Sequence, residues 1–155
     1  MAKVFDDAKK GDITAFSKIY GDVCERIYYV AYYSLASSEE AVKAVTEAAR
    51  YAYENAEDCN NERELKELML KKTCEQIVNR FREYKKASPP YEPFPSFIRS
   101  QMLRLTDAER LSVMVWAVYG YEVEKISALT GLALDVVVKK LESGQSKLSA
   151  NLQQN

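Results

Sequence analysis

The stretch TDAERLSVMVWAVYGYEVEKISALTG, residues Thr106 to Gly131, decides the fold of the C-terminal part of the chain. It opens with the capping-box pattern T-x-x-E, in which the threonine and the glutamate each satisfy a free backbone N–H at a helix start. Gly120 ends this predicted helix, and a short helix over 123–129 stops at Gly131. A longer helix is predicted from about Asp135. This order is typical of a helix-turn-helix, and its expected inward residues are Leu111, Met114, Val115, Val118, Val137, Leu141 and Leu148.

The first 86 residues also have a helical pattern. A short helix over 2–10 ends at Gly11, and Asp12 is placed to cap the next one. Ser37 or Ser38 caps a third helix, and a fourth follows from about Glu64, after the polar loop 57–62. Apolar residues recur at helical spacing in the second (Phe16, Ile19, Tyr20, Val23, Ile27, Val30), third (Val42, Val45, Ala49, Ala52) and fourth helix (Leu70, Cys74, Ile77, Phe81, Tyr84). Since no strand pattern stands out, we predict an all-α fold.

The four prolines lie together in the segment ASPPYEPFPS, between these two helical regions. Proline lacks the backbone N–H and clashes with the preceding turn, so this segment is not the interior of a helix. We therefore interpret residues 87–96 as a linker between a helical module at 1–86 and a second one at 97–155. A long loop within one domain is the alternative.

The composition excludes several classes of function. The 155-residue chain has no histidine, which removes triads, Cys–His pairs and histidine metal sites. It has five glycines and neither phosphate-binding glycine motif, and its three cysteines form no C-x-x-C pair. We expect a non-enzyme with no cofactor and no metal. An odd, sparse set of cysteines, no signal peptide and no apolar stretch long enough to span a bilayer favour a cytoplasmic protein without membrane insertion.

Two blocks of the N-terminal module resemble bacterial extracytoplasmic-function sigma factors of RNA polymerase. The family's second domain opens with G-D-x-x-A-F-x-x-x-Y, which matches Gly11, Asp12, Ala15, Phe16 and Tyr20. The segment EEAVKAVTEAARYAY (39–53) is similar to the family's acidic helix, with matches at Ala41, Val45, Glu47 and Tyr53. Lys43, Thr46 and Ala49 depart from that pattern.

The C-terminal module resembles the family's fourth domain, a helix-turn-helix. The match runs through Leu105, Arg110, Gly120, Glu124, Ile126, Leu129 and Gly131. The last helix departs most, because Ser143 and Gln145 stand where the family has arginines. Gly144 is expected to weaken that helix by roughly 1 kcal/mol relative to alanine. Val136 and Val138 are expected to face outward.

The resemblance implies two partners, core RNA polymerase and promoter DNA, and makes an anti-sigma protein a possible third. It implies polymerase contacts at Glu40, Lys43, Thr46, Glu47 and Arg50. Contacts with a −10-like element are implied at Asn60, Asn61, Gln76, Asn79, Arg80, Arg82, Lys85 and Lys86, and with a −35-like element at Asp135, Val136, Val138, Lys139, Lys140 and Lys147. In the family, the loop before the fourth helix holds an extruded base.

Two other functions compete with a sigma factor. A sigma-like adaptor that has lost most DNA contacts also fits the acidic loop 57–62, the missing arginines and the outward-facing Val136 and Val138. The net charge of −1 is a further reason to doubt DNA binding by the chain alone. A helix-turn-helix repressor with a ligand-sensing N-terminal module is the third possibility. Residues 28, 29, 32 and 33 are tyrosines, and we expect them to pack against neighbouring helices with some of them exposed. We expect Trp116 to be a core residue.

Overall fold

The computed structural model describes residues 2–84 and 97–153, and every regular element in these ranges is helical. The elements are α1 (Ala2–Lys9), α2 (Ile13–Leu35), α3 (Ser38–Glu54), the 3-10 turn η1 (Ala56–Asp58), α4 (Glu62–Tyr84), α5 (Phe97–Met102), α6 (Asp107–Tyr119), α7 (Val123–Thr130) and α8 (Leu134–Gln153). The predicted all-α class is confirmed. Helix α5 was not predicted, and the proposed linker 87–96 lies outside the described residues.

Local signals set the ends of these helices. Asp12 accepts the backbone N–H of Ala15 at 3.1 Å, at the start of α2. Thr106 caps α6 in a complete capping box. Gly120 and Gly131 end α6 and α7 with φ of 69° and 75°, in the left-handed region that glycine adopts without strain. These helix ends depend on neighbouring residues alone, which is why the sequence predicts them.

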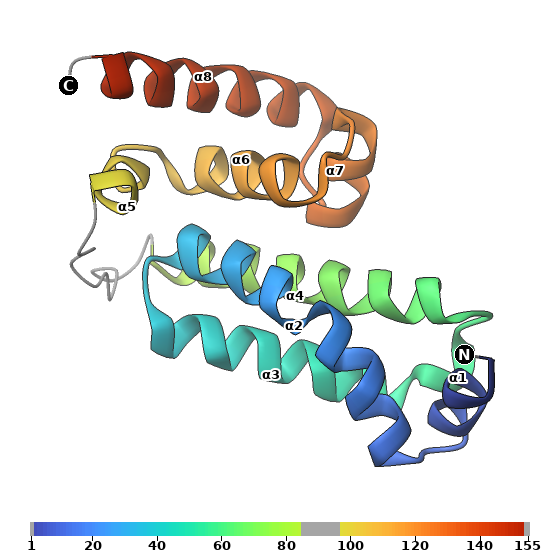
Figure 1. Ribbon diagram of the computed structural model, residues 1–155. Helices are drawn as coiled ribbons and strands as arrows, with labels where there is room; N and C mark the ends of the chain where they lie inside the picture. The colour runs from blue at the N-terminus through green and yellow to red at the C-terminus, as the bar shows by residue number, and fades with distance from the viewer. Residues whose placement is uncertain (1, 85–96, 154–155) are drawn as a thin grey trace.

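Helices α1–α4 form one group around a shared core. Helix α2 packs against α1, α3 and α4, and Figure 1 shows α2, α3 and α4 side by side with α1 at the far end. Cys74 is fully buried there, as predicted. The core residues of this group include Phe5, Phe16, Ile19, Ile27, Val30, Leu35, Leu65, Met69, Leu70, Ile77 and Phe81.

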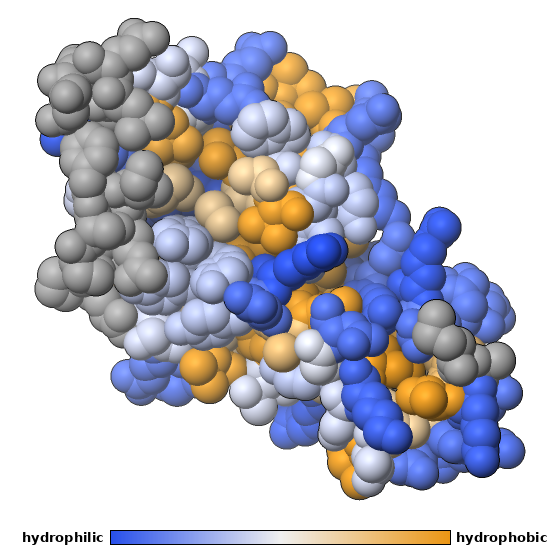
Figure 2. Space-filling model, viewed as in Figure 1, coloured by the Kyte–Doolittle hydropathy of each residue, from blue (hydrophilic) through white to orange (hydrophobic). Residues whose placement is uncertain are grey.

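Helices α6–α8 form a second group that lies on the first. Helix α8 packs along α6, and α7 packs against α8. The second group meets the first where α6 crosses α2 and α7 meets α4. Its buried residues include Leu105, Leu111, Val113, Val115, Ile126, Leu129, Val137 and Leu141. Figure 2 shows apolar surface along the boundary between the groups, crossed by hydrophilic side chains.

Some predicted inward positions are wrong. Trp116 is 42% exposed and Val42 is 53% exposed, so neither is a core residue. Both lie on helix faces that no neighbouring helix covers, and helical spacing alone does not tell which faces are covered. Val136 and Val138, expected to face outward, are half-buried.

The four tyrosines of α2 behave as expected for packed aromatic residues. Tyr32 is buried, and its ring stacks on that of Tyr28 with centroids 5.8 Å apart. Tyr29 is the most exposed of the four, at 41%. Packing of these rings against each other and neighbouring helices accounts for the cluster.

Helices that could cross a membrane are absent from the described ranges. Nor do these ranges contain a cluster of three or more cysteine and carboxylate side chains suited to a metal ion.

Candidate polymerase and nucleic-acid interfaces

The predicted polymerase-binding residues lie on the side of α3 that faces away from the core. Thr46, Glu47 and Arg50 are exposed. Lys43 is exposed as well, and its ammonium lies 3.2 Å from the carboxylate of Glu39. Glu40 differs from these four, because it is half-buried and turned toward α4. The exposed residues of α3 therefore present a mixed-charge face, with Val42 in its middle.

Glu40 and Arg80, which the family resemblance assigns to two different partners, pair with each other. The Nε of Arg80 lies 2.9 Å from Glu40 Oε2. Arg80 also donates to the side-chain oxygen of Gln76 at 3.0 Å, and its side chain is only 11% exposed. This contact joins α3 to α4. A phosphate that bound Arg80 would lie close to the Glu40 carboxylate, which already pairs with the guanidinium.

The turn from η1 to α4 is organised by hydrogen bonds around Glu64. Glu64 accepts the backbone N–H of Asn60 at 2.8 Å, and the Asn61 side chain accepts the backbone N–H of Glu64 at 2.9 Å. The bond from the Asn60 backbone lowers the pKa of Glu64 below its usual value. Both asparagines are exposed, and Asn61 has the role of a helix N-cap. The turn is thus held in one conformation by its own side chains.

The other predicted −10 residues lie along α4. Asn79 and Arg82 are exposed, and Gln76 is half-buried under Arg80. Arg82 lines a cavity of about 390 Å³ together with Lys140 of α8. This cavity brings together one residue from each of the two predicted DNA-contacting sets. Lys85 and Lys86 lie outside the described residues.

On α8, Asp135 and Lys139 are exposed, and Lys140 is half-buried. Lys147 is tied to the protein itself, because its ammonium lies 2.7 Å from Oε1 of Glu109, a side chain only 2% exposed. Ser143 donates a second bond to Glu109, and the backbone N–H of Thr106 donates a third. Residues 143 and 147 therefore fasten α8 to the start of α6.

These hydrogen bonds set the ionisation of Glu109. Burial raises the pKa of a carboxyl group, but here the bonds from Lys147, Ser143 and the Thr106 backbone outweigh burial and lower the pKa from 4.5 to about 2. Glu109 is consequently a carboxylate at neutral pH. Its negative charge holds the Lys147 cation that was assigned to phosphate.

Gly144 has a packing role that the sequence did not indicate. A Cβ at this position would lie 2.7 Å from Cγ2 of Val113 and 3.3 Å from Cδ2 of Leu105. Such distances are shorter than ordinary van der Waals contact. The glycine therefore permits the close approach of α8 to α6, beside the Glu109 hydrogen bonds.

Arg110 joins the two helical groups. Its side chain is 2% exposed, and its Nε donates to the backbone oxygen of Ser34 on α2 at 3.0 Å. It also donates to the backbone oxygen of Leu105 and pairs with Asp107. The sequence marked Arg110 only as a motif position, because its partner on α2 is 76 residues away.

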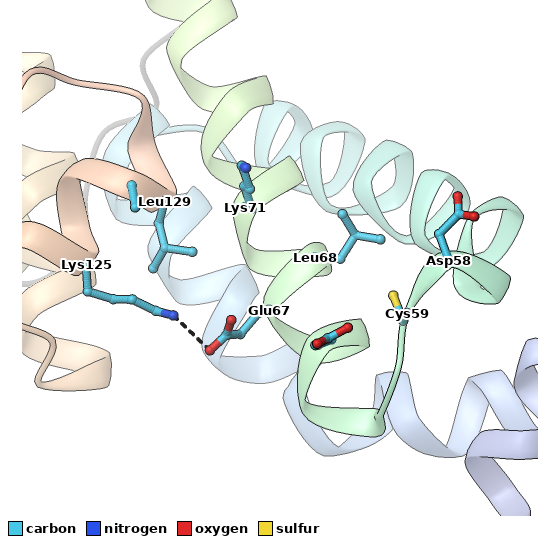
Figure 3. Close-up of a pocket in the computed structure, with 9 residues that line it drawn as sticks. Asp58, Cys59, Glu67, Leu68, Lys71, Lys125 and Leu129 are labelled. Atoms are coloured by element: carbon cyan, nitrogen blue, oxygen red, sulfur yellow. Dashed lines mark hydrogen bonds and ion pairs between the residues drawn. The ribbon is translucent and has the colours of Figure 1, made fainter.

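A second contact between the groups lies between α4 and α7. The ammonium of Lys125 is 2.9 Å from Oε1 of Glu67, and Figure 3 shows this pair spanning the gap, with Leu68 and Leu129 beside it. These side chains line a cavity of about 370 Å³ that extends to Cys59. Neither Lys125 nor Glu67 was among the predicted site residues, since nothing in the sequence pairs positions 58 apart.

Comparison with known proteins identifies the fold. No family model matches the sequence, and no curated protein matches it either. Among solved structures, CnrH in complex with the cytosolic domain of CnrY matches with a TM-score of 0.71 at 17% identity, over 99% of this chain and 97% of that one. The sigma factor RpoE of Bartonella quintana, solved with the anti-sigma factor NepR, matches with a TM-score of 0.66 at 14% identity, over 91% of this chain and 98% of that one. The chain has the fold of the extracytoplasmic-function sigma factors.

Proposed function

We propose that this chain is a sigma-type transcription initiation factor that acts in the cytoplasm by binding core RNA polymerase and promoter DNA. One observation carries the proposal: the fold likeness extends over nearly all of this chain and nearly all of both matched structures. A likeness to only one helical group would fit many helix-turn-helix proteins. The order of the N-terminal and C-terminal sequence blocks supports the same proposal.

Core polymerase is proposed to bind the exposed face of α3, through Lys43, Thr46, Glu47 and Arg50. These side chains extend into solvent from one helix, so a partner can reach them without rearranging the chain. Glu40 is proposed to support this face indirectly, because it lies beneath it and pairs with Lys43 at 3.6 Å.

Promoter DNA is proposed to contact two regions. The first comprises the turn at Asn60 and Asn61 and the exposed α4 residues Asn79 and Arg82, for the −10-like element. The second is α8 around Lys139 and Lys140, for the −35-like element. Hydrogen bonds to base edges would supply sequence specificity, and cations would supply phosphate affinity. This role uses binding free energy and includes no catalytic step.

A sigma-like adaptor is the second candidate, and a specific observation favours it. Arg80 and Lys147 are engaged by Glu40 and Glu109, so two of the predicted phosphate-binding cations are already neutralised. Such a chain would bind polymerase or a regulatory protein and leave promoter DNA unread. RpoE was solved with a partner protein, and a protein partner of the anti-sigma kind is proposed for this chain too.

Transcription with purified core polymerase from the source organism tests both candidates. The template is that organism's genomic DNA, and the readout is the mapped 5′ ends of the transcripts. A sigma factor yields discrete start sites that depend on the added chain. Polymerase binding is measured in parallel by co-elution in gel filtration.

The double variant E47K/R50E provides a sharp test of the α3 face, because it reverses two exposed charges and keeps the net charge. We expect it to abolish co-elution and transcription. The control K18E alters an exposed lysine of α2 and is expected to leave both unchanged. Co-elution without discrete start sites would refute the sigma function in favour of the adaptor. No co-elution of the unaltered chain would refute the sigma function and an adaptor that binds polymerase, and would leave an adaptor that binds a regulatory protein.

A further inference from the structure

A cavity of about 460 Å³ lies where α2 and α4 meet the segment between α6 and α7. Its floor includes Val23 and Leu70, and Tyr119 and Tyr121 line it from the other helical group. A cavity of this volume is in the range of small-molecule sites, which commonly occur between domains. None of the polymerase or DNA contacts proposed above uses it.

Positive charge is concentrated around this cavity. Four cations line it, Arg26, Arg63, Lys66 and Lys125, against the single carboxylate of Glu67. That carboxylate is shared, at 2.9 Å from Lys125 and 3.9 Å from Arg63. Lys66 pairs with Glu62 and Asp22, which lie outside the lining.

Arg26 is the cation best placed to take an added anion. It is exposed, and within the described residues it forms no ion pair. A guanidinium binds phosphate through two parallel N–H bonds, which gives both affinity and orientation. Lys125 lies at the same cavity, and because its ammonium is paired with Glu67, it would share its charge between that carboxylate and an anion bound at Arg26.

The two tyrosines form an aromatic wall. Their rings are stacked with centroids 5.3 Å apart and an angle of 13° between planes. The ammonium of Lys125 lies 5.7 Å from the ring centroid of Tyr121. Burial, with smaller contributions from neighbouring groups, raises the pKa of Tyr119 above its usual value, so its phenol keeps its proton. A flat aromatic group that entered the cavity would meet a flat aromatic partner.

We propose that this cavity binds a free nucleoside polyphosphate, with the base against Tyr121 and the phosphates at Arg26 and Lys125. An aromatic wall, an apolar floor and a cationic rim together match a ligand with one flat ring and several negative charges. An acidic peptide would contact the cations of the rim and would have no group to place against the aromatic wall. Because the lining comes from both helical groups, the bound nucleotide holds the groups together. The proposal does not rest on a sigma function.

Isothermal titration of the full chain with ATP, and separately with inorganic tripolyphosphate, tests the site. We expect saturable ATP binding at low salt, weakened about tenfold by R26A, since a lost bond to a charged group costs about 1.5 kcal/mol or more. Y121L is expected to weaken ATP and leave tripolyphosphate unchanged. The control K18A removes an exposed cation of α2 outside the cavity and is expected to change neither. Circular dichroism checks that each variant is folded.

Three results would overturn the proposal. The first is no saturable binding of ATP by the unaltered chain. The second is binding of tripolyphosphate as tight as that of ATP, which would show that the base does not contribute to binding. The third is Arg26-dependent binding of a short thymidine oligonucleotide without ATP binding, which would assign the cavity to nucleic acid. None of these measurements involves polymerase, so they are independent of the transcription test.

Discussion

Gly144→Ala is expected to destabilise the protein, although helix propensity alone predicts the opposite. Alanine in a helix interior is favoured over glycine by about 1 kcal/mol. The added Cβ, however, would lie 2.7 Å from Val113 Cγ2 and 3.3 Å from Leu105 Cδ2. Overpacking of a core costs about 1–3 kcal/mol. The difference predicts a net loss of about 1 kcal/mol in the free energy of unfolding.

Urea unfolding at pH 7, followed by circular dichroism, measures this change. Gly21→Ala is the matched control, because Gly21 lies within α2 and a Cβ there would meet nothing within 4 Å. It is expected to raise stability by up to about 1 kcal/mol through propensity alone. The two glycine variants should therefore shift the unfolding midpoint in opposite directions.

The variant Val113→Ala separates the clash from other effects. It removes the methyl group that meets the new Cβ, so the cost of G144A should be smaller in the V113A background than in the unaltered chain. Contacting residues of this kind couple by about 0.5–3 kcal/mol in a double-mutant cycle. If G144A stabilises the protein as much as G21A does, the result would contradict the close approach of α8 to α6 at Gly144.

Three further predictions concern single groups. The pKa of Glu109 is lowered from 4.5 to about 2, so its ionised form contributes about 3 kcal/mol to the free energy of unfolding above pH 4.5, and this contribution is lost as the pH falls toward 2. The loss of stability between these pH values should therefore be smaller in E109Q, which urea unfolding at a series of pH values measures. Trp116 is the single tryptophan and is 42% exposed, so iodide should quench the tryptophan fluorescence of the folded protein. Fluorescence that iodide quenches only after unfolding would contradict this exposed position. Cys24 is half-exposed, whereas Cys74 is fully buried and burial raises the pKa of its thiol to about 12. Cys24 should therefore react with a thiol reagent well before Cys74, and equal rates would show that α4 opens readily.

Local signals allowed the sequence to predict most of the fold. The caps at Asp12 and Thr106 and the left-handed glycines at Gly120 and Gly131 act within four residues along the chain, so reading the neighbouring letters is enough. Helix α5 was missed because its six residues are too few to show a helical stripe. Trp116 was misplaced because a helical stripe tells which residues share a face and leaves open which faces are covered.

The candidate sites were harder to predict, because their chemistry depends on contacts between distant parts of the chain. Arg80 meets Glu40 across 40 residues, and Lys147 meets Glu109 across 38. Without these contacts, each cation is expected to be available to phosphate. Ser143 stands where the resembled family has an arginine, and in the structure its hydroxyl donates a hydrogen bond to the buried Glu109. An arginine at position 143 would remove the hydrogen bond from the Ser143 hydroxyl to Glu109.

These internal ion pairs change what the proposed DNA contacts can contribute. A free cation that binds phosphate releases a counterion from DNA and gains affinity that falls steeply with salt. Arg80 is already paired with Glu40, and Lys147 with Glu109, so a phosphate bound by either cation would lie close to a carboxylate. With a net charge of −1 on the whole chain, little long-range attraction compensates for that repulsion. Under the proposed function, polymerase must therefore bring the chain to the promoter, and base contacts, rather than phosphate contacts, must select the site.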